Sequence, residues 1–303
     1  MFERLLTRFS AGFVVAFHDI PAERAEQFIE ALHPARPIPL DEMVERAGNG
    51  KTTAGLFAIT IDDGVGETVR SLSRLFETRQ WPATFYLPTG YIDNGEGMVF
   101  QWWRAIRPLL PRRKIELKSE TLDFSAPGAI EELSKKMERR WHAGRLESYR
   151  PVTMDLVEFV TRDRGIDREE IHPPAPVTWD EVAEIARTGL IQFESHGVTH
   201  AAMSSLNDAE LEFEMRQSRD TVARHTGRAC RHLAYPFGSW TSIGDRAASA
   251  AARFYDSATT MTPGHVEGAN ASLLPRIPLY PENPTHMARL KVLLTCTRLS
   301  RAH

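Results

Sequence analysis

The sequence predicts an α/β protein in which parallel strands form a barrel. Short apolar runs recur along the 303 residues, segments of helical pattern separate them, and the first three runs are almost continuously apolar. Such continuous apolar character is typical of strands that are buried on both faces of a parallel sheet. The predicted strands are Phe13–Phe17, Phe57–Ile61, Ala83–Leu87, Leu190–Phe193, His232–Tyr235, Phe254–Thr259 and Leu273–Leu279.

The segments between these strands complete the pattern. Alternating strands and helices imply right-handed βαβ units, and seven strands favour a barrel over an open sheet. A helix is expected over residues 65–79. The clearest helix covers Asn207–His225, because Asn207 and Glu210 form a capping pattern at its start and Gly227 follows its end.

The segment Asp93–Pro176 interrupts the alternation. It contains no convincing strand, is rich in charged residues and ends in a proline-rich stretch, so we expect a mostly helical insertion between two barrel strands. Trp102 and Trp103 near its start either dock it onto the barrel or line a site for a sugar, and packing is the commoner role of aromatic pairs. The predicted domains are a barrel over residues 10–285 with the insertion at 93–176, and a C-terminal segment at 286–303.

The composition is that of a soluble globular protein, with 42% hydrophobic residues, 25% charged residues and a net charge of −3. It excludes disorder for the bulk of the chain, and the near-neutral balance argues against a nucleic-acid partner. Two cysteines are too few for a disulfide scaffold and fit a reducing compartment. No apolar run reaches the ~18–20 residues that a membrane span needs.

The two ends of the sequence bear on location. The apolar stretch Ala11–Phe17 is too short for a secretory signal and has no cleavage site after it, so we expect a first strand and a cytoplasmic protein. Residues 285–303 combine four basic residues and several apolar ones with no acid. They predict either a basic amphipathic helix in peripheral contact with the inner membrane or, more commonly, a terminal helix packed on the barrel.

Asp62 and Asp63 are the first candidate functional residues. They follow a buried strand and precede Gly64. The carboxyl ends of barrel strands form the active-site rim, where neighbouring side chains diverge, so the two carboxylates can take two roles. Taken alone, Asp-Asp-Gly is more typical of a turn that caps a helix, because Asp and Gly are common turn residues.

His196 and His200 form the second motif, again after an apolar run. Histidines four residues apart on one side of a helical turn can both reach one ion. With one aspartate they supply three ligands that suit zinc or another divalent metal and leave a position open for a water, whose pKa then falls toward ~7. A second carboxylate beside the metal can act as the general base.

The third motif is Tyr235-Pro-Phe-Gly238 at the end of a further apolar run. Its proline lies between two aromatic residues. The motif predicts either a groove wall whose backbone N–H groups turn toward the site, or a simple turn with aromatic packing.

Together the three motifs resemble those of the polysaccharide deacetylase family, also called the NodB-homology domain or carbohydrate esterase family 4. Thr60-Ile-Asp-Asp-Gly64, His196-Gly-Val-Thr-His200 and Tyr235-Pro-Phe-Gly238 stand in the order of the family's motifs. The resemblance covers approximately residues 10–90 and 177–280, and it implies a distorted (β/α)₇ barrel with a mostly helical insertion.

The resemblance also implies roles for individual residues. Asp62 matches the catalytic base, and Asp63, His196 and His200 match the ligands of one divalent metal ion. Zinc is expected, with cobalt, nickel and manganese as alternatives. The implied reaction is hydrolysis of N-acetyl, sometimes O-acetyl, groups on sugars, with a backbone N–H such as that of Phe237 helping to hold the oxyanion. The whole third motif, Tyr235, Pro236 and Phe237, is expected to contact the substrate.

The sequence departs from the family pattern at two points. Many members carry an arginine where Ala234 stands, and we expect Arg276 to orient the base in its place. Many members also supply a general-acid histidine from a late Leu-x-His motif, which this sequence lacks. His18 is the first candidate for the acid and His265 the second, and a purely structural role is the alternative for each.

The sequence therefore predicts a metal-dependent hydrolase that removes N-acetyl groups from a sugar in a bacterial polysaccharide or glycolipid precursor. One alternative is an O-acetyl carbohydrate esterase on the same fold. Another is a non-catalytic carbohydrate-binding relative, which the two departures motivate. The intact Asp62, Asp63, His196 and His200 favour an enzyme, because a pure binder needs no base beside a metal triad.

Overall fold

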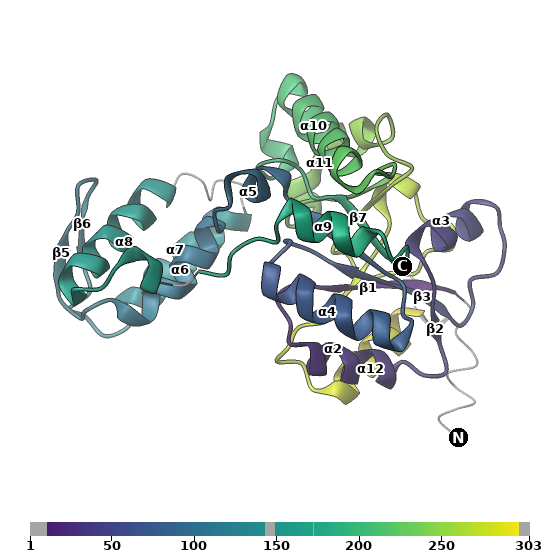
Figure 1. Cartoon of the computed structure of the whole chain (residues 1–303), viewed down its shortest axis with the longest axis horizontal. Coiled ribbons are helices and arrows are strands. Elements are labelled where there is room, and N and C mark those ends of the chain that lie inside the picture. Colours follow the sequence, from purple (N-terminus) through teal and green to yellow (C-terminus); the bar gives the residue numbers. More distant parts are fainter. Residues whose placement is uncertain (1–10, 143–148, 172, 297–303) are drawn as a thin grey trace. The chain divides into compact units, whose positions relative to one another are not determined.

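The computed structural model describes residues 11–142, 149–171 and 173–296. The chain divides into two compact units, one comprising Met1–Asn94 and Val177–His303 and the other comprising Gly95–Pro176 (Figure 1). The first unit contains a large parallel sheet with its helices. The second contains helices and a small hairpin.

The sheet of the first unit has the strand order β10-β1-β3-β4-β7-β8-β9, with β2 paired to β3, and all of its pairs are parallel. Leu274, just before β10, forms a parallel bridge with Thr259 at the end of β9, so the sheet curls round toward closure. The predicted distorted (β/α)₇ barrel is thereby confirmed. Its strands are β1 (Phe13–Phe17), β2 (Arg36–Pro37), β3 (Leu56–Ile61), β4 (Ala83–Leu87), β7 (Ile191–Ser195), β8 (His232–Ala234), β9 (Ser257–Thr259) and β10 (Ile277–Pro278).

Alternate residues of each strand point to opposite faces of the sheet. On β1, Phe13 and Phe17 belong to the main core cluster between the sheet and its helices, whereas Val14 belongs to a second cluster with Ala58 and Tyr86 of neighbouring strands. Both faces are therefore buried. This explains why the strands read as continuous apolar runs in the sequence.

Except for α3, the helices of the first unit cover the outside of the sheet. α2, α4 and α12 lie side by side in Figure 1, and each contributes buried side chains to the main core. α10 begins as predicted, with the Asn207 side chain accepting from the Glu210 N–H, and Gly227 ends it in the left-handed conformation. The helices are α2 (Ala22–Ala31), α3 (Leu40–Gly48), α4 (Gly66–Arg79), α5 (Thr89–Asn94), α9 (Trp179–Ala186), α10 (Asp208–Thr226), α11 (Trp240–Ala251) and α12 (Thr285–Cys296).

The last two barrel strands are shorter than predicted. β9 begins only at Ser257, because Phe254 still lies in the turn that ends α11, where its N–H donates to the Ala251 carbonyl. β10 contains only Ile277 and Pro278. Prolines at 275 and 278 lack the N–H that a longer ladder needs.

The C-terminal helix α12 packs on the barrel. It contacts α2, and Ala288 and Val292 lie in the main core, while Met287, Leu290 and Leu294 remain exposed. The rest of the predicted C-terminal segment, residues 297–303, lies outside the described residues, as does the N-terminal stretch 1–10. Among the described helices, none has the length and apolar character to cross a membrane. Peripheral membrane contact and a cytoplasmic location stay predictions.

The second unit has its own hydrophobic core. Trp102 and Trp103 are buried in it, the Trp103 Nε1–H donates to Ser134 Oγ at 3.2 Å, and the Arg168 guanidinium stacks 4.9 Å above the Trp102 ring. The two tryptophans therefore hold this unit together internally. Its three-residue strands were not predicted, since each carries only one inward apolar residue. The elements are α6 (Val99–Ile106), α7 (Ala129–His142), α8 (Arg150–Arg164) and the antiparallel pair β5 (Lys114–Glu116) and β6 (Thr121–Asp123).

Candidate metal and catalytic site

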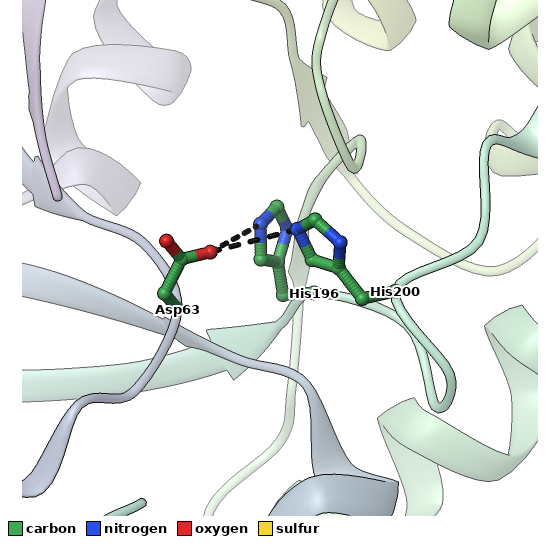
Figure 2. A group of neighbouring side chains, drawn as sticks. All are labelled: Asp63, His196 and His200. Carbon is green, nitrogen blue, oxygen red and sulfur yellow. Dashed lines mark ion pairs between the residues drawn. The ribbon is translucent and has the colours of Figure 1, made fainter. Parts of the chain in front are cut away.

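Three polar side chains from two barrel strand ends converge on one point. Asp63 follows β3, and His196 and His200 follow β7. Asp63 Oδ1 lies 3.7 Å from His196 Nε2 and 3.5 Å from His200 Nε2, and all three side chains are buried (Figure 2). Their potential ligand atoms lie within 4.8 Å of one another.

The backbone at this rim adopts unusual conformations. Asp63, His200 and Phe237 all have positive φ angles, of 74°, 55° and 64°. Residues other than glycine rarely adopt such angles, each of which costs on the order of 1–3 kcal/mol, and they cluster at functional sites. Gly64 and Gly238 continue the left-handed turns after Asp63 and Phe237, where a side chain would add further strain.

The His196 ring is fixed by a second contact. Its Nδ1 lies 2.7 Å from the Ala234 carbonyl oxygen, so Nδ1–H donates to that oxygen and Nε2 is turned toward Asp63. Burial alone would raise the pKa of the Asp63 carboxyl, but hydrogen bonds with His196 and His200 bring it well below its ordinary value. The carboxylate is therefore ionised at neutral pH.

This donor set fits a divalent metal ion. Two imidazole nitrogens and one carboxylate oxygen form a common ligand set of catalytic zinc sites. Ligand bonds of ~2.1 Å in tetrahedral geometry place ligand atoms about 3.4 Å apart, close to the 3.5 and 3.7 Å separations found here. The second contact of His196 is also the kind that orients metal-binding histidines.

Asp62 is held by a buried arginine. Arg276 Nη1 and Nη2 each donate to a different Asp62 carboxylate oxygen at 2.7 Å, and Arg276 is fully buried. Arg276 also donates to Thr60 Oγ1 and the Thr260 carbonyl, which fixes its plane. Burial raises the pKa of Asp62, but the charge and hydrogen bonds of Arg276 together with the charges of His196 and His18 outweigh it, and the pKa lies below its ordinary value.

The two candidate acids lie at opposite ends of the barrel. His18 follows β1, and its Nε2 lies 3.7 Å from Asp62 Oδ2, with the side chain one-third exposed. His265 lies beside Glu267, whose carboxylate accepts from the N–H of Gly12. Gly12 precedes β1, so His265 sits at the end of the barrel away from Asp62 and Asp63. Only His18 of the two is placed to act on a substrate there.

The third motif contributes less to the site than predicted. Tyr235 is fully buried in the main core, and its hydroxyl donates to the Ser272 carbonyl, so its side chain does not face the site. Pro236 is buried as well. The ring of Phe237 is partly exposed and lies edge-on to His200, with centroids 4.8 Å apart.

Two residues near the site were missed from sequence. Tyr280 is 40% exposed and its ring stacks on His18, with centroids 6.5 Å apart. Glu214 of α10 is buried against the loop between the two histidines. The sequence did contain one signal for Glu214: it stands three residues after Leu211, on the apolar side of a predicted helix, where an acid is unusual. No local pattern marks Tyr280, because its partner is distant in sequence.

The fold and site place the chain among the α/β barrels that carry a candidate metal site at the carboxyl ends of their strands. A model of the polysaccharide deacetylase family matches residues 49–254, and the chain belongs to this family. No curated protein shows significant sequence similarity to the chain.

Several solved structures share the fold of the chain. The deacetylase PplD of Streptococcus pyogenes, in complex with acetate, is 15% identical with a TM-score of 0.59, over 94% of this chain and 98% of that chain. IcaB from Ammonifex degensii is 12% identical with a TM-score of 0.59, over 95% and 97%. The deacetylase domain of BpsB from Bordetella bronchiseptica is 14% identical with a TM-score of 0.57, over 90% and 97%.

Proposed function

We propose that the protein is a metal-dependent hydrolase that removes N-acetyl groups from a sugar in a bacterial polysaccharide or glycolipid precursor. The observation that carries this proposal is a buried carboxylate, Asp62, held by Arg276 directly beside the group Asp63, His196 and His200. Membership of the polysaccharide deacetylase family supports the acetylated carbohydrate as the substrate class.

The residues divide the work between binding and proton transfer. Asp63, His196 and His200 hold the divalent ion, with zinc as the first choice. When bound, the ion supplies a water of lowered pKa and polarises the acetyl carbonyl. Asp62 accepts the proton of the attacking water, and Arg276 keeps its carboxylate ionised and oriented.

The leaving amine needs a proton, and we propose His18 as its source. It lies beside Asp62 and is partly open to solvent, so a proton can reach it from the medium. The Tyr280 ring next to it is 40% exposed, stacks on His18 and has Lys291 Nζ 5.6 Å from its centroid, so its exposed part can contact a sugar. Phe237 lies edge-on to His200 and so also borders the group of ligands.

An O-acetyl esterase would use the same residues, so only a comparison of substrates distinguishes it from the proposed N-deacetylase. Matched pairs of sugars that differ only in an N-acetyl or an O-acetyl group at one position give a direct test. The proposal predicts acetate release from the amide of a pair at a rate at least equal to that from the ester, although the ester is intrinsically more reactive. Release from esters alone identifies an esterase. Sugar binding without any release, with the metal bound, identifies a non-catalytic relative.

A further inference from the structure

The carboxylate of Glu214 lies against the loop that joins the two histidines. Glu214 is in the middle of α10 and is 3% exposed. Its Oε2 accepts from the N–H of Val198 at 2.6 Å and from the N–H of Thr199 at 3.1 Å. Its Oε1 accepts from Thr199 Oγ1 at 2.6 Å. One side chain thus binds both residues that immediately precede His200.

The rest of this loop is anchored to its surroundings. The Gly197 N–H donates to Ser195 Oγ, and the Gly197 and Val198 carbonyls accept from the N–H groups of Thr89 and Gly90 at the start of α5. Glu214 takes the two remaining amides of residues 197–199. Without the Glu214 carboxylate, the N–H groups of Val198 and Thr199 would lose this acceptor.

The fit between Glu214 and the loop is close. Gly197 has a φ of 77°, and a Cβ at this position would lie 2.9 Å from Glu214 Oε2. The residue after His196 must therefore be glycine both for its backbone conformation and for the approach of the carboxylate. His200, at the other end of the loop, has the strained φ of 55°, which needs support from its neighbours.

We propose that Glu214 is the positioning residue of the metal site: its carboxylate fixes the loop that sets the spacing of the His196 and His200 imidazoles. The inference rests on the proposed function, in which these two histidines hold the ion. Glu214 touches neither the ion nor the substrate. Loss of residues that hydrogen-bond to metal ligands typically costs 10–100-fold in metal affinity, and we expect a similar effect from the residue that fixes the loop between two ligands.

Glu214→Gln tests the proposal with little change of shape. Glutamine keeps one acceptor oxygen but replaces the other with an NH₂ group, which is a donor. That NH₂ group would face a donor of Val198 or Thr199, so at least one of the hydrogen bonds is lost. Glu212→Gln, on the exposed side of the same helix, is the matched control. We expect Glu214→Gln to bind zinc 10–100-fold more weakly than wild type in a competition titration with a chelating dye. Glu212→Gln should bind as wild type does, and saturating zinc should restore most of the activity of Glu214→Gln.

Amide hydrogen exchange of the metal-free protein gives a readout that does not depend on zinc. Protection of the Val198 and Thr199 amides should fall at least tenfold in Glu214→Gln, with the rest of α10 protected as in the control. Zinc affinity and loop protection equal to the control would overturn the inference. Failure of wild type to bind zinc would contradict the proposed function, and the exchange data would still decide whether Glu214 fixes the loop.

Discussion

Arg276 and Asp62 form a fully buried ion pair at the centre of the candidate site. Such a pair adds little net stability, because desolvating both charges costs about as much as their attraction gains. Arg276 instead orients the Asp62 carboxylate and keeps it ionised, because its guanidinium donates to both oxygens of this proposed base. The resemblance placed the expected arginine at the position of Ala234, and here Arg276 approaches Asp62 from the residue just before β10.

Replacing Arg276 should move the pH dependence of the reaction. The guanidinium lowers the pKa of Asp62, so its loss raises that pKa and leaves the base protonated to higher pH. We expect Arg276→Ala to reduce kcat/KM by ~100-fold or more and to shift the acidic limb of its pH profile upward. Arg276→Lys keeps the positive charge but cannot donate to both Asp62 oxygens in the same way, so its kcat/KM should lie between those of wild type and Arg276→Ala. Unchanged activity and metal content in Arg276→Ala would refute this role.

His18 should act on the leaving group. His18→Gln keeps a polar side chain of similar size but cannot donate a proton as an acid. We expect a loss of ~10²–10⁴ in kcat on an amide substrate and a flattened alkaline limb of the pH profile. Substrates with better leaving groups should be affected less. If His18→Gln keeps full activity at every pH, the proton comes from elsewhere, with Asp62 itself the next candidate.

At the scale of elements, α3 closes the end of the barrel opposite the site. Its Leu40 and Met43 pack in the second hydrophobic cluster, the one that contains Val14, Ala58 and Tyr86. Its Asp41 carboxylate accepts hydrogen bonds from His232 Nε2 at 2.8 Å and Gln192 Nε2 at 2.6 Å. These contacts tie α3 to β7 and β8. α3 therefore covers the amino ends of these strands, and the candidate site lies at their carboxyl ends.

The tie between α3 and β8 should fail in acid. The hydrogen bond with His232 lowers the pKa of Asp41 to about 2, below the ~3.9 of an unfolded chain. Its stabilisation, about 1–2 kcal/mol after allowance for solvent, is therefore complete above pH ~4 and is lost as pH falls toward 2. Urea unfolding of Asp41→Asn should show this deficit at pH 7 and a smaller one at pH 3. Glu42→Gln is the neighbouring control, and a deficit independent of pH would exclude the mechanism.

Prediction from the sequence succeeded where signals were local. Strands β1, β3 and β4 follow from unbroken apolar runs. Asp62, Asp63 and His196 stand directly after strands and His200 ends the loop after β7, while the roles of these four residues stay predictions. The short β9 and β10 were overextended, because prolines and a helix-ending turn override apolar content there. Tyr235 was expected to contact the substrate, but its side chain is buried, and a tyrosine in a loop motif gives no sign that its hydroxyl finds the Ser272 carbonyl. Contacts such as that of Glu214 with Val198 exist only in three dimensions.

At the scale of the whole molecule, the ion should act as part of the fold. The three ligands come from two distant parts of the chain, Asp63 and His196–His200, so an ion bound there links β3 to β7. A ligand that binds only the folded state adds about 2.7 kcal/mol at 100 times its Kd. Zinc should therefore raise the Tm of the metal-stripped protein by several degrees. Asp63→Asn should abolish most of this rise, and an equal rise in that variant would place the ion elsewhere.

Acetate release by metal-loaded wild type and Asp62→Asn, from a panel of N-acetylated sugars, tests the central claim most directly. Zinc content is measured on the same samples. The account predicts release by wild type, loss of at least ~100-fold in Asp62→Asn, and equal zinc in both, because Asp62 serves as the base and Asp63 as the ligand. Equal release by the two proteins, or no release by zinc-loaded wild type from any sugar of the panel, would contradict it.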